Sequence, residues 1–165
     1  MKNTAVLYGS TTGNTEAVAK KIATELDAAI FDVALQPVSE IHKYQNLVLG
    51  TSTLGIGDLQ DDWDAFLPAF AKAELEEKNI ALFGLGDADM YPDSFVDGMG
   101  IIYEAIKDKG CTIIGQTDIK GYEFDGSEAV VDGKFVGLPL DEDNQGDLTD
   151  GRIKAWLEQL KTKFS

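Results

Sequence analysis

The stretch TAVLYGSTTGNT, residues 4–15, decides the fold of this chain. Its first part, Thr4 to Tyr8, is an apolar run typical of a buried strand, and the small polar residues after it are typical of a loop. Val18, Ile22 and Leu26 then recur every four residues, which indicates one face of a helix. A strand, a loop and a helix in this order predict the first unit of an α/β protein.

The same alternation continues along the chain. Apolar runs predict strands at 30–35, 46–50, 79–84 and 111–115, and a run at 134–140 resumes the last strand after a turn-rich excursion over 116–133. Helical spacing of apolar residues predicts three further helices, marked by Trp63, Phe66, Leu67 and Phe70, by Phe95, Met99, Ile102 and Ile106, and by Ile153, Trp156, Leu157 and Leu160. We therefore expect one doubly wound α/β domain over residues 1–165, with helices on both faces of a parallel sheet and a ligand site at the carboxyl ends of its strands.

The composition excludes several classes of function. Twenty-nine acidic and 14 basic side chains give a formal charge of −15, so the surface repels nucleic acid and anionic lipid and would attract basic proteins. High charge also keeps a protein soluble, and composition alone does not separate these two readings. The single cysteine, Cys111, is expected to be a buried core residue, and the single histidine, His42, a surface residue, which leaves no disulfide, iron–sulfur cluster or histidine triad. Without an apolar run long enough for a membrane span, or a signal peptide, we expect a cytoplasmic protein.

The loop after the first predicted strand has the composition of a phosphate site. Four hydroxyl side chains and two glycines lie where the helix begins, and the N–H groups at a helix start are unpaired and partly positive. The lysine of a Walker loop and the Gly-x-Gly-x-x-Gly pattern of a Rossmann fold are both missing, so neutral donors would have to hold a single terminal phosphate. The alternative is that the hydroxyl groups only cap the helix.

Three loops together resemble those of the flavodoxin family, of the long-chain type. Residues 10–15 (STTGNT) resemble its phosphate loop, residues 51–63 (TSTLGIGDLQDDW) its second flavin loop, and residues 84–91 (GLGDADMY) its third. The chain departs from the family at Ser52, where proline is usual, at Leu54, where an aromatic residue frequently stacks on the flavin, and at Asp89 and Met90. Residues 135–152 resemble the family's last strand, loop and helix, and 116–133 resemble the loop that splits strand five in long-chain members.

The resemblance implies five parallel strands in the order 2-1-3-4-5 and one non-covalently bound FMN. It also implies that Tyr91 stacks on the outer face of the flavin ring, that Asp87 accepts from the ring N3–H, and that Asp143 reaches the ribityl hydroxyls. As a hypothesis, the Gly55 carbonyl turns to accept a hydrogen bond from N5–H, since glycine tolerates φ of either sign. No metal is expected, and the residues expected to bind the cofactor are Ser10, Thr11, Thr12, Gly13, Asn14, Thr15, Thr53, Leu54, Gly55, Ile56, Gly57, Asp87, Tyr91, Ser94 and Asp143.

The function implied is that of a low-potential one-electron carrier, not an enzyme, whose FMN passes between quinone, semiquinone and hydroquinone states. Its acidic surface would steer basic redox partners, both reductases and electron acceptors, into transient complexes, with the carrier itself a monomer that binds neither nucleic acid nor membrane. The alternative is an FMN-dependent quinone or azo reductase on the same fold, which needs a substrate pocket that no insertion here offers. A phospho-acceptor receiver domain needs an acidic pair after the first strand, where this chain has Gly9-Ser10.

Overall fold

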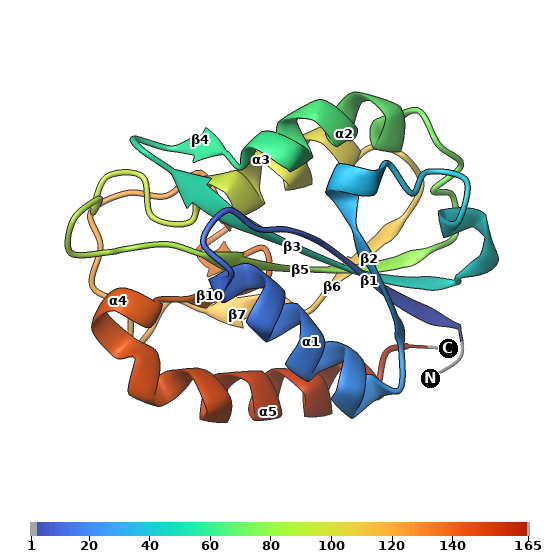
Figure 1. The fold of residues 1–165 in the computed structure, drawn as a ribbon. Helices are drawn as coiled ribbons and strands as arrows, with labels where there is room; N and C mark the ends of the chain where they lie inside the picture. Colours follow the sequence, from blue (N-terminus) through green and yellow to red (C-terminus); the bar gives the residue numbers. More distant parts are fainter. Residues whose placement is uncertain (1–2, 165) are drawn as a thin grey trace.

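A mostly parallel sheet forms the middle layer of the computed structural model, which describes residues 3–164 (Figure 1). Its hydrogen-bonded order is β10-β5-β3-β1-β2, with β6 also paired to β5 and β4 to β3. The strands of this sheet are β1 (Thr4–Gly9), β2 (Ala29–Asp32), β3 (Asn46–Leu54), β4 (Asp58–Leu59), β5 (Asn79–Leu85), β6 (Thr112–Ile114) and β10 (Leu138–Leu140). Only β4 runs antiparallel to its neighbour.

The predicted strand order is confirmed. The second predicted strand lies beside the first, and the third and fourth, β3 and β5, follow on the other side of β1. The fifth is split as expected, because β6 pairs with the beginning of β5 and β10 with its end. The carboxyl ends of β1, β3 and β5 therefore lie side by side, and the loops that follow them meet at one edge of the sheet.

Helices cover both faces of the sheet because side chains of a strand point alternately to opposite faces. Helices α1 (Asn14–Leu26) and α5 (Thr149–Lys161) cover one face, and α2 (Asp61–Ala71) and α3 (Asp97–Ile106) the other (Figure 1). Val6 and Val48 pack in the core under α1 and α5, whereas their neighbours Leu7 and Leu49 pack in the core under α2 and α3. No helix among residues 3–164 combines the length and apolarity that crossing a bilayer requires.

Three local predictions are wrong. The strand expected over 30–35 ends at Asp32, because the Asp32 carboxylate accepts from the Ala34 N–H at 2.9 Å and caps the 3₁₀ turn η1 (Val33–Leu35). The run 134–140 is not one strand, since β9 (Lys134–Phe135) and β10 belong to different sheets. Cys111, directly before β6, is only half-buried and packs against the edge of the core, whereas His42, in η2 (Ile41–Lys43), is exposed as expected.

The excursion between β6 and β10 is a folded part of the molecule. It contains a small antiparallel sheet with the order β7-β9-β8, in which β7 is Thr117–Asp118 and β8 is Val130–Val131. Tyr122 packs its ring at 5.8 Å from Phe95 and 5.2 Å from Phe135, which joins the excursion to the core beside α3. The backbone of Glu128 passes so close to Gly100 that a Cβ there would lie 2.6 Å from the Glu128 carbonyl oxygen. The chain then forms α4 (Glu142–Gln145) and η3 (Gly146–Leu148) before α5.

Candidate functional site

A cleft of about 270 Å³ lies where the loops after β1, β3 and β5 meet α4. Its walls come from four separate segments of the chain, all at the carboxyl edge of the sheet. Eleven of the predicted cofactor-binding residues line it: Thr11, Thr12, Asn14, Thr15, Thr53, Leu54, Gly55, Asp87, Tyr91, Ser94 and Asp143. The remaining four predicted residues, Ser10, Gly13, Ile56 and Gly57, belong to the same loops but do not line the cleft.

The loop after β1 presents the open N-terminus of α1 to the cleft. Gly13 takes the left-handed φ of 96° at the N-cap position, and its N–H donates to Ser10 Oγ at 3.1 Å. Within the described residues, no side chain caps this helix, so the hydroxyl groups of the loop do not serve the capping role that was the alternative. Thr11 and Thr12 are exposed at the cleft wall, beside the uncapped first turn of α1, whose N–H groups are suited to an anion.

The loop after β3 turns sharply at two glycines and is tied to α3. Gly55 and Gly57 have φ of 50° and 92°, and the turn they make lets β4 fold back on the end of β3. The Gly98 N–H donates to Thr53 Oγ1 at 2.9 Å, which holds the loop against the first turn of α3. Ile56 points outward and is 85% exposed, at the outer tip of the turn rather than in the cleft.

Asp97 joins this turn to the long excursion. Its Oδ1 accepts from the Glu128 N–H at 2.8 Å, and its Oδ2 lies so close to Gly57 that a Cβ there would come within 2.8 Å of it. Burial raises the pKa of this carboxyl, against the lowering effect of the Glu128 hydrogen bond. The buried carboxyl group of Asp97 therefore lies between the turn at Gly57 and the excursion, and it is hydrogen-bonded to the excursion.

The loop after β5 is held in shape by Asp87. Its Oδ1 accepts from the Met90 N–H at 2.9 Å and from the Asn144 side-chain amide at 2.8 Å. Partial burial would raise the pKa of Asp87, but these hydrogen bonds outweigh it and lower the pKa. Tyr91 follows at the cleft wall with 39% of its surface exposed, a position from which its ring can cover a flat ligand.

The acidic segment before α5 closes the cleft from the fourth side. Asp141 is buried, and its Oδ2 accepts from the Ala88 N–H at 3.1 Å, which fastens this segment to the loop after β5. Carboxylate oxygens of Asp87, Asp141 and Asp143 lie within 4.8 Å of one another. Burial, followed by the charges of Asp87, Asp141 and Glu142, raises the pKa of Asp143. The cleft is therefore strongly negative on this side and neutral on the side of α1.

Two buried hydroxyl groups in the cleft wall have no hydrogen-bond partner within residues 3–164, those of Ser52 and Ser94. A buried polar group left unpaired costs about 1–3 kcal/mol, so such groups are rare and call for an explanation. Both oxygen atoms lie beneath the surface of the cleft, so a ligand would contact them only after the serine side chains rotate. The groups that are accessible in the wall, the hydroxyl groups of Thr11 and Thr12 and the ring of Tyr91, fit a polar, partly aromatic ligand with an anionic end at α1.

Four residues of the cleft wall were missed by the sequence analysis: Ser52, Leu85, Gly86 and Glu142. Each lies close in sequence to a residue of the predicted site, in or beside a loop that follows a strand. Its position after a strand was therefore the feature of the sequence that could have identified it. Ser52 was noted only as a departure from proline in the family pattern, and its buried hydroxyl could not be foreseen from the sequence.

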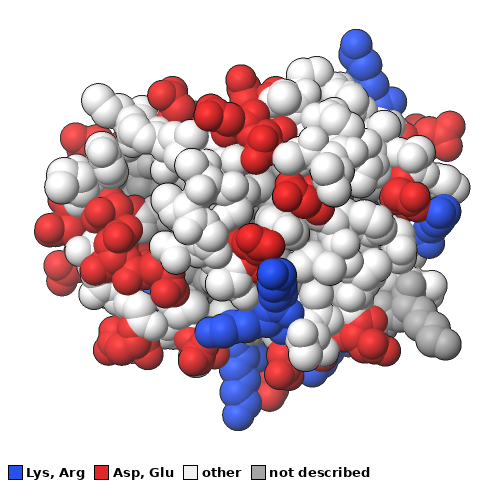
Figure 2. All heavy atoms as spheres, in the orientation of Figure 1, with Lys and Arg blue, Asp and Glu red and all other residues white. Residues whose placement is uncertain are grey.

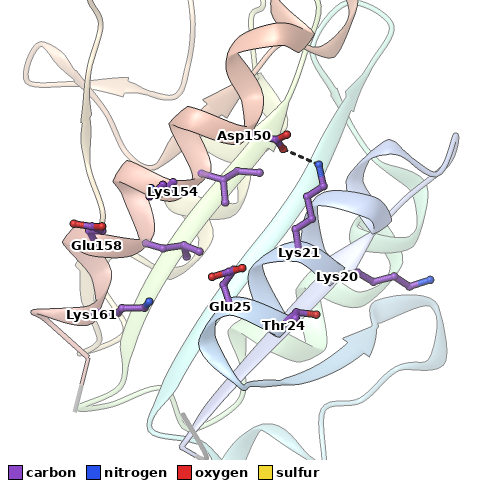
Figure 3. Close-up of a pocket in the computed structure, with 10 residues that line it drawn as sticks. Lys20, Lys21, Thr24, Glu25, Asp150, Lys154, Glu158 and Lys161 are labelled. Carbon is purple, nitrogen blue, oxygen red and sulfur yellow. Dashed lines mark hydrogen bonds and ion pairs between the residues drawn. The ribbon is translucent and has the colours of Figure 1, made fainter.

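Charge is unevenly distributed over the surface. Figure 2 shows acidic side chains gathered over the left end of the molecule, where Figure 1 places α4 and the loops at the carboxyl ends of the strands. A second hollow, of about 630 Å³, lies between α1 and α5, away from these loops (Figure 3). Its lysines alternate with carboxylates, and Lys21 pairs with Asp150 at 2.7 Å, so it is not a purely cationic site.

Comparison with known proteins gives a consistent relationship. The flavodoxin family model matches residues 6–156. A flavodoxin of Helicobacter pylori is 43% identical over 166 residues, with complete coverage of both chains, and one of Nostoc sp. is 42% identical over 99% of this chain and 98% of its own. The crystal structure of Fusobacterium nucleatum flavodoxin bound to flavin mononucleotide superposes with a TM-score of 0.93 at 31% identity and covers all of both chains. The chain belongs to the flavodoxin family.

Proposed function

We propose that this protein binds one FMN in the cleft and carries single electrons between redox partners. The observation that supports this most strongly is that the cleft opens on the N-terminus of α1, which no side chain of the described residues caps, while Tyr91 flanks the same cleft. The flavodoxin of Fusobacterium nucleatum, which has the same fold, is bound to flavin mononucleotide. Bound FMN would supply the redox chemistry, which the protein tunes by contact, hydrogen bonding and charge.

The residues divide by the part of the ligand they would hold. The phosphate would lie at the first turn of α1, among the hydroxyl groups of Thr11, Thr12 and Thr15 and the helix N–H groups. Tyr91 would cover one face of the ring, an aromatic contact worth about 0.5–1.5 kcal/mol beyond the area it buries. Leu54, half-buried in the opposite loop, would offer the other face an aliphatic surface.

Charge near the ring would keep the potentials low. Asp87 and Asp143 line the cleft, and the lowered pKa of Asp87 keeps that group ionised at neutral pH. Adding an electron next to fixed negative charges is unfavourable, by an amount that falls with distance and with salt. We infer a carrier of low potential. The same acidic surface would favour brief, salt-sensitive complexes with basic partner proteins.

Several further features belong to this proposal. We infer that residues 1–165 act as one FMN-binding domain and that the protein works as a monomer in the cytoplasm. The carbonyl of Gly55 would turn toward the ligand, since its φ of 50° is in the region that glycine occupies at little cost. Asp87 would hold its loop through Met90 and Asn144 while remaining within reach of a ligand donor.

The test is spectroelectrochemical titration of the purified protein. A carrier should retain FMN and take up two electrons in separate one-electron steps, and it should not oxidise NADH or NADPH unless a reductase is added. Turnover of a nicotinamide cofactor by the protein alone would contradict the proposal and favour the reductase alternative.

A further inference from the structure

Gln60 is a buried amide, 1% exposed, that connects the start of α2 with the loop after β1. Its Oε1 accepts from the Trp63 N–H at 3.1 Å, which caps α2. Its Nε2 donates to Asp62 Oδ2 at 2.9 Å and to Thr11 Oγ1 at 3.3 Å. Gln60 does not line the cleft, whereas Thr11 does.

The partners determine which way this amide is turned. A backbone N–H can only donate and an ionised carboxylate can only accept, so the oxygen must face Trp63 and the nitrogen must face Asp62. The nitrogen is therefore also the atom that reaches Thr11. Gln60 packs tightly in this orientation, because a Cβ at Gly9 would lie within 2.2 Å of its Oε1.

The Gln60 amide constrains the only proton of the Thr11 hydroxyl group. A hydroxyl group has one donor proton and two acceptor lone pairs, and here Gln60 occupies an acceptor position. The proton of Thr11 is left to donate elsewhere, and Thr11 is exposed at the cleft wall beside the first turn of α1. A doubly ionised phosphate monoester, the form that prevails above about pH 6, accepts hydrogen bonds and does not donate them, so a hydroxyl group held as a donor suits it.

We infer that Gln60 is a positioning residue that holds the Thr11 hydroxyl group as a donor toward the phosphate, and so helps select phosphorylated flavin over riboflavin. This inference rests on the proposed function, because it places the phosphate at α1.

Gln60→Glu separates this role from the cap. The carboxylate has the same shape and can still accept from the Trp63 N–H, but it cannot donate to Thr11 and would accept the Thr11 proton instead. Because the new carboxylate would also face Asp62 Oδ2, all variants and their reference carry Asp62→Asn, whose amide can donate to it. Thr11→Val removes the hydroxyl group at an exposed position with little effect on folding, and Thr11→Ser retains it as the matched control.

The experiment measures dissociation constants of FMN and riboflavin by flavin fluorescence, with inorganic phosphate as a competitor of FMN. We expect Gln60→Glu and Thr11→Val each to weaken FMN binding by about 10- to 100-fold, the usual cost of a hydrogen bond to a charged group, and to leave riboflavin binding unchanged within about twofold. The double variant should lose no more than the larger single loss, and Thr11→Ser should stay near the reference.

Three results would overturn the inference, and they differ in what they say about the proposed function. Equal losses for FMN and riboflavin would make Gln60 purely structural. Losses that multiply in the double variant would mean that the new charge at position 60, rather than Thr11, weakens binding. In both cases the FMN site itself would stand. A wild-type protein that binds FMN no better than riboflavin would instead remove the phosphate site, and with it this inference.

Discussion

Neutralising Asp143 should stabilise the flavin-free protein at neutral pH. Partial burial and the neighbouring charges of Asp87, Asp141 and Glu142 raise the pKa of this carboxyl, so its ionised form is less favourable in the folded state than in the unfolded chain. At pH values above its folded-state pKa, the ionised group therefore lowers the free energy of unfolding. This loss of stability disappears at pH values low enough to protonate the group in both the folded and the unfolded state. Asp143→Asn removes the charge and keeps the size and shape of the side chain.

The distance between the carboxylates sets the size of the effect. The oxygens of Asp87, Asp141 and Asp143 lie within 4.8 Å of one another. At this separation, with the dielectric constant of about 80 that suits an exposed group, each repulsion is worth about 0.9 kcal/mol. Asp143 is exposed and salt screens its interactions, so we expect a gain of about 1 kcal/mol from the two neighbours together.

Urea unfolding of the flavin-free protein measures this gain without a contribution from ligand binding. Asp143→Asn should be more stable than wild type near pH 7 in low salt, and the gain should fall as the pH approaches about 4. It should shrink by half or more in about 1 M salt. Asp147→Asn, an exposed neighbour outside the cluster, is the control. A gain no larger than that of the control, or one that salt and pH leave unchanged, would refute this account of the acidic cluster.

Three further substitutions test other parts of the structure. Trp63→Phe loses the bond from the indole Nε1–H to the Gly50 carbonyl, 2.7 Å long and buried, and should cost about 1–3 kcal/mol in urea unfolding; an unchanged midpoint would contradict this. Gly100→Ala would place a methyl group 2.6 Å from the Glu128 carbonyl and should increase hydrogen exchange of the backbone amides in the excursion 116–133. Exchange rates equal to those of wild type would show that the close contact does not hold the excursion in place. At Gly55 there is space for a methyl group, but the φ of 50° would strain an alanine by about 1–2 kcal/mol. Because this strain would hinder the carbonyl from turning, Gly55→Ala should narrow the gap between the two one-electron reduction potentials of the flavin. An unchanged gap would count against a turning carbonyl at this glycine.

The middle of the sheet was predictable because its strands β1, β3 and β5 are buried on both faces. Runs such as 46–50 carry a continuous apolar signal, and helices such as α5 repeat apolar residues at a period near 3.6. The run 134–140 is a case in which this apolar pattern does not predict the structure correctly. After Lys134 its residues are apolar or glycine, but Gly137 passes against the backbone of Leu82, where a Cβ would come within 2.0 Å of the carbonyl oxygen. That close approach separates β9 from β10, and it depends on a contact distant in sequence.

The candidate site was predictable as three loops but not as a network of contacts. Topology places the loops after β1, β3 and β5 at one edge, so residues such as Thr12 and Tyr91 could be assigned to one cleft from their positions alone. The burial of the Ser52 hydroxyl group and the reach of Gln60 to Thr11 depend on how the loops pack against one another. A single sequence carries no pattern that reports such contacts.

The central claim is that uncharged donors at the N-terminus of α1 hold the phosphate of a single FMN. Amide chemical shifts of isotope-labelled, flavin-free protein during titration with FMN test it most directly. We predict that the amides of residues 10–15 shift and that the change is complete at one FMN per chain, with smaller shifts in the same amides on adding inorganic phosphate. Shifts confined to the lysine-containing hollow between α1 and α5, or none in residues 10–15, would contradict the claim.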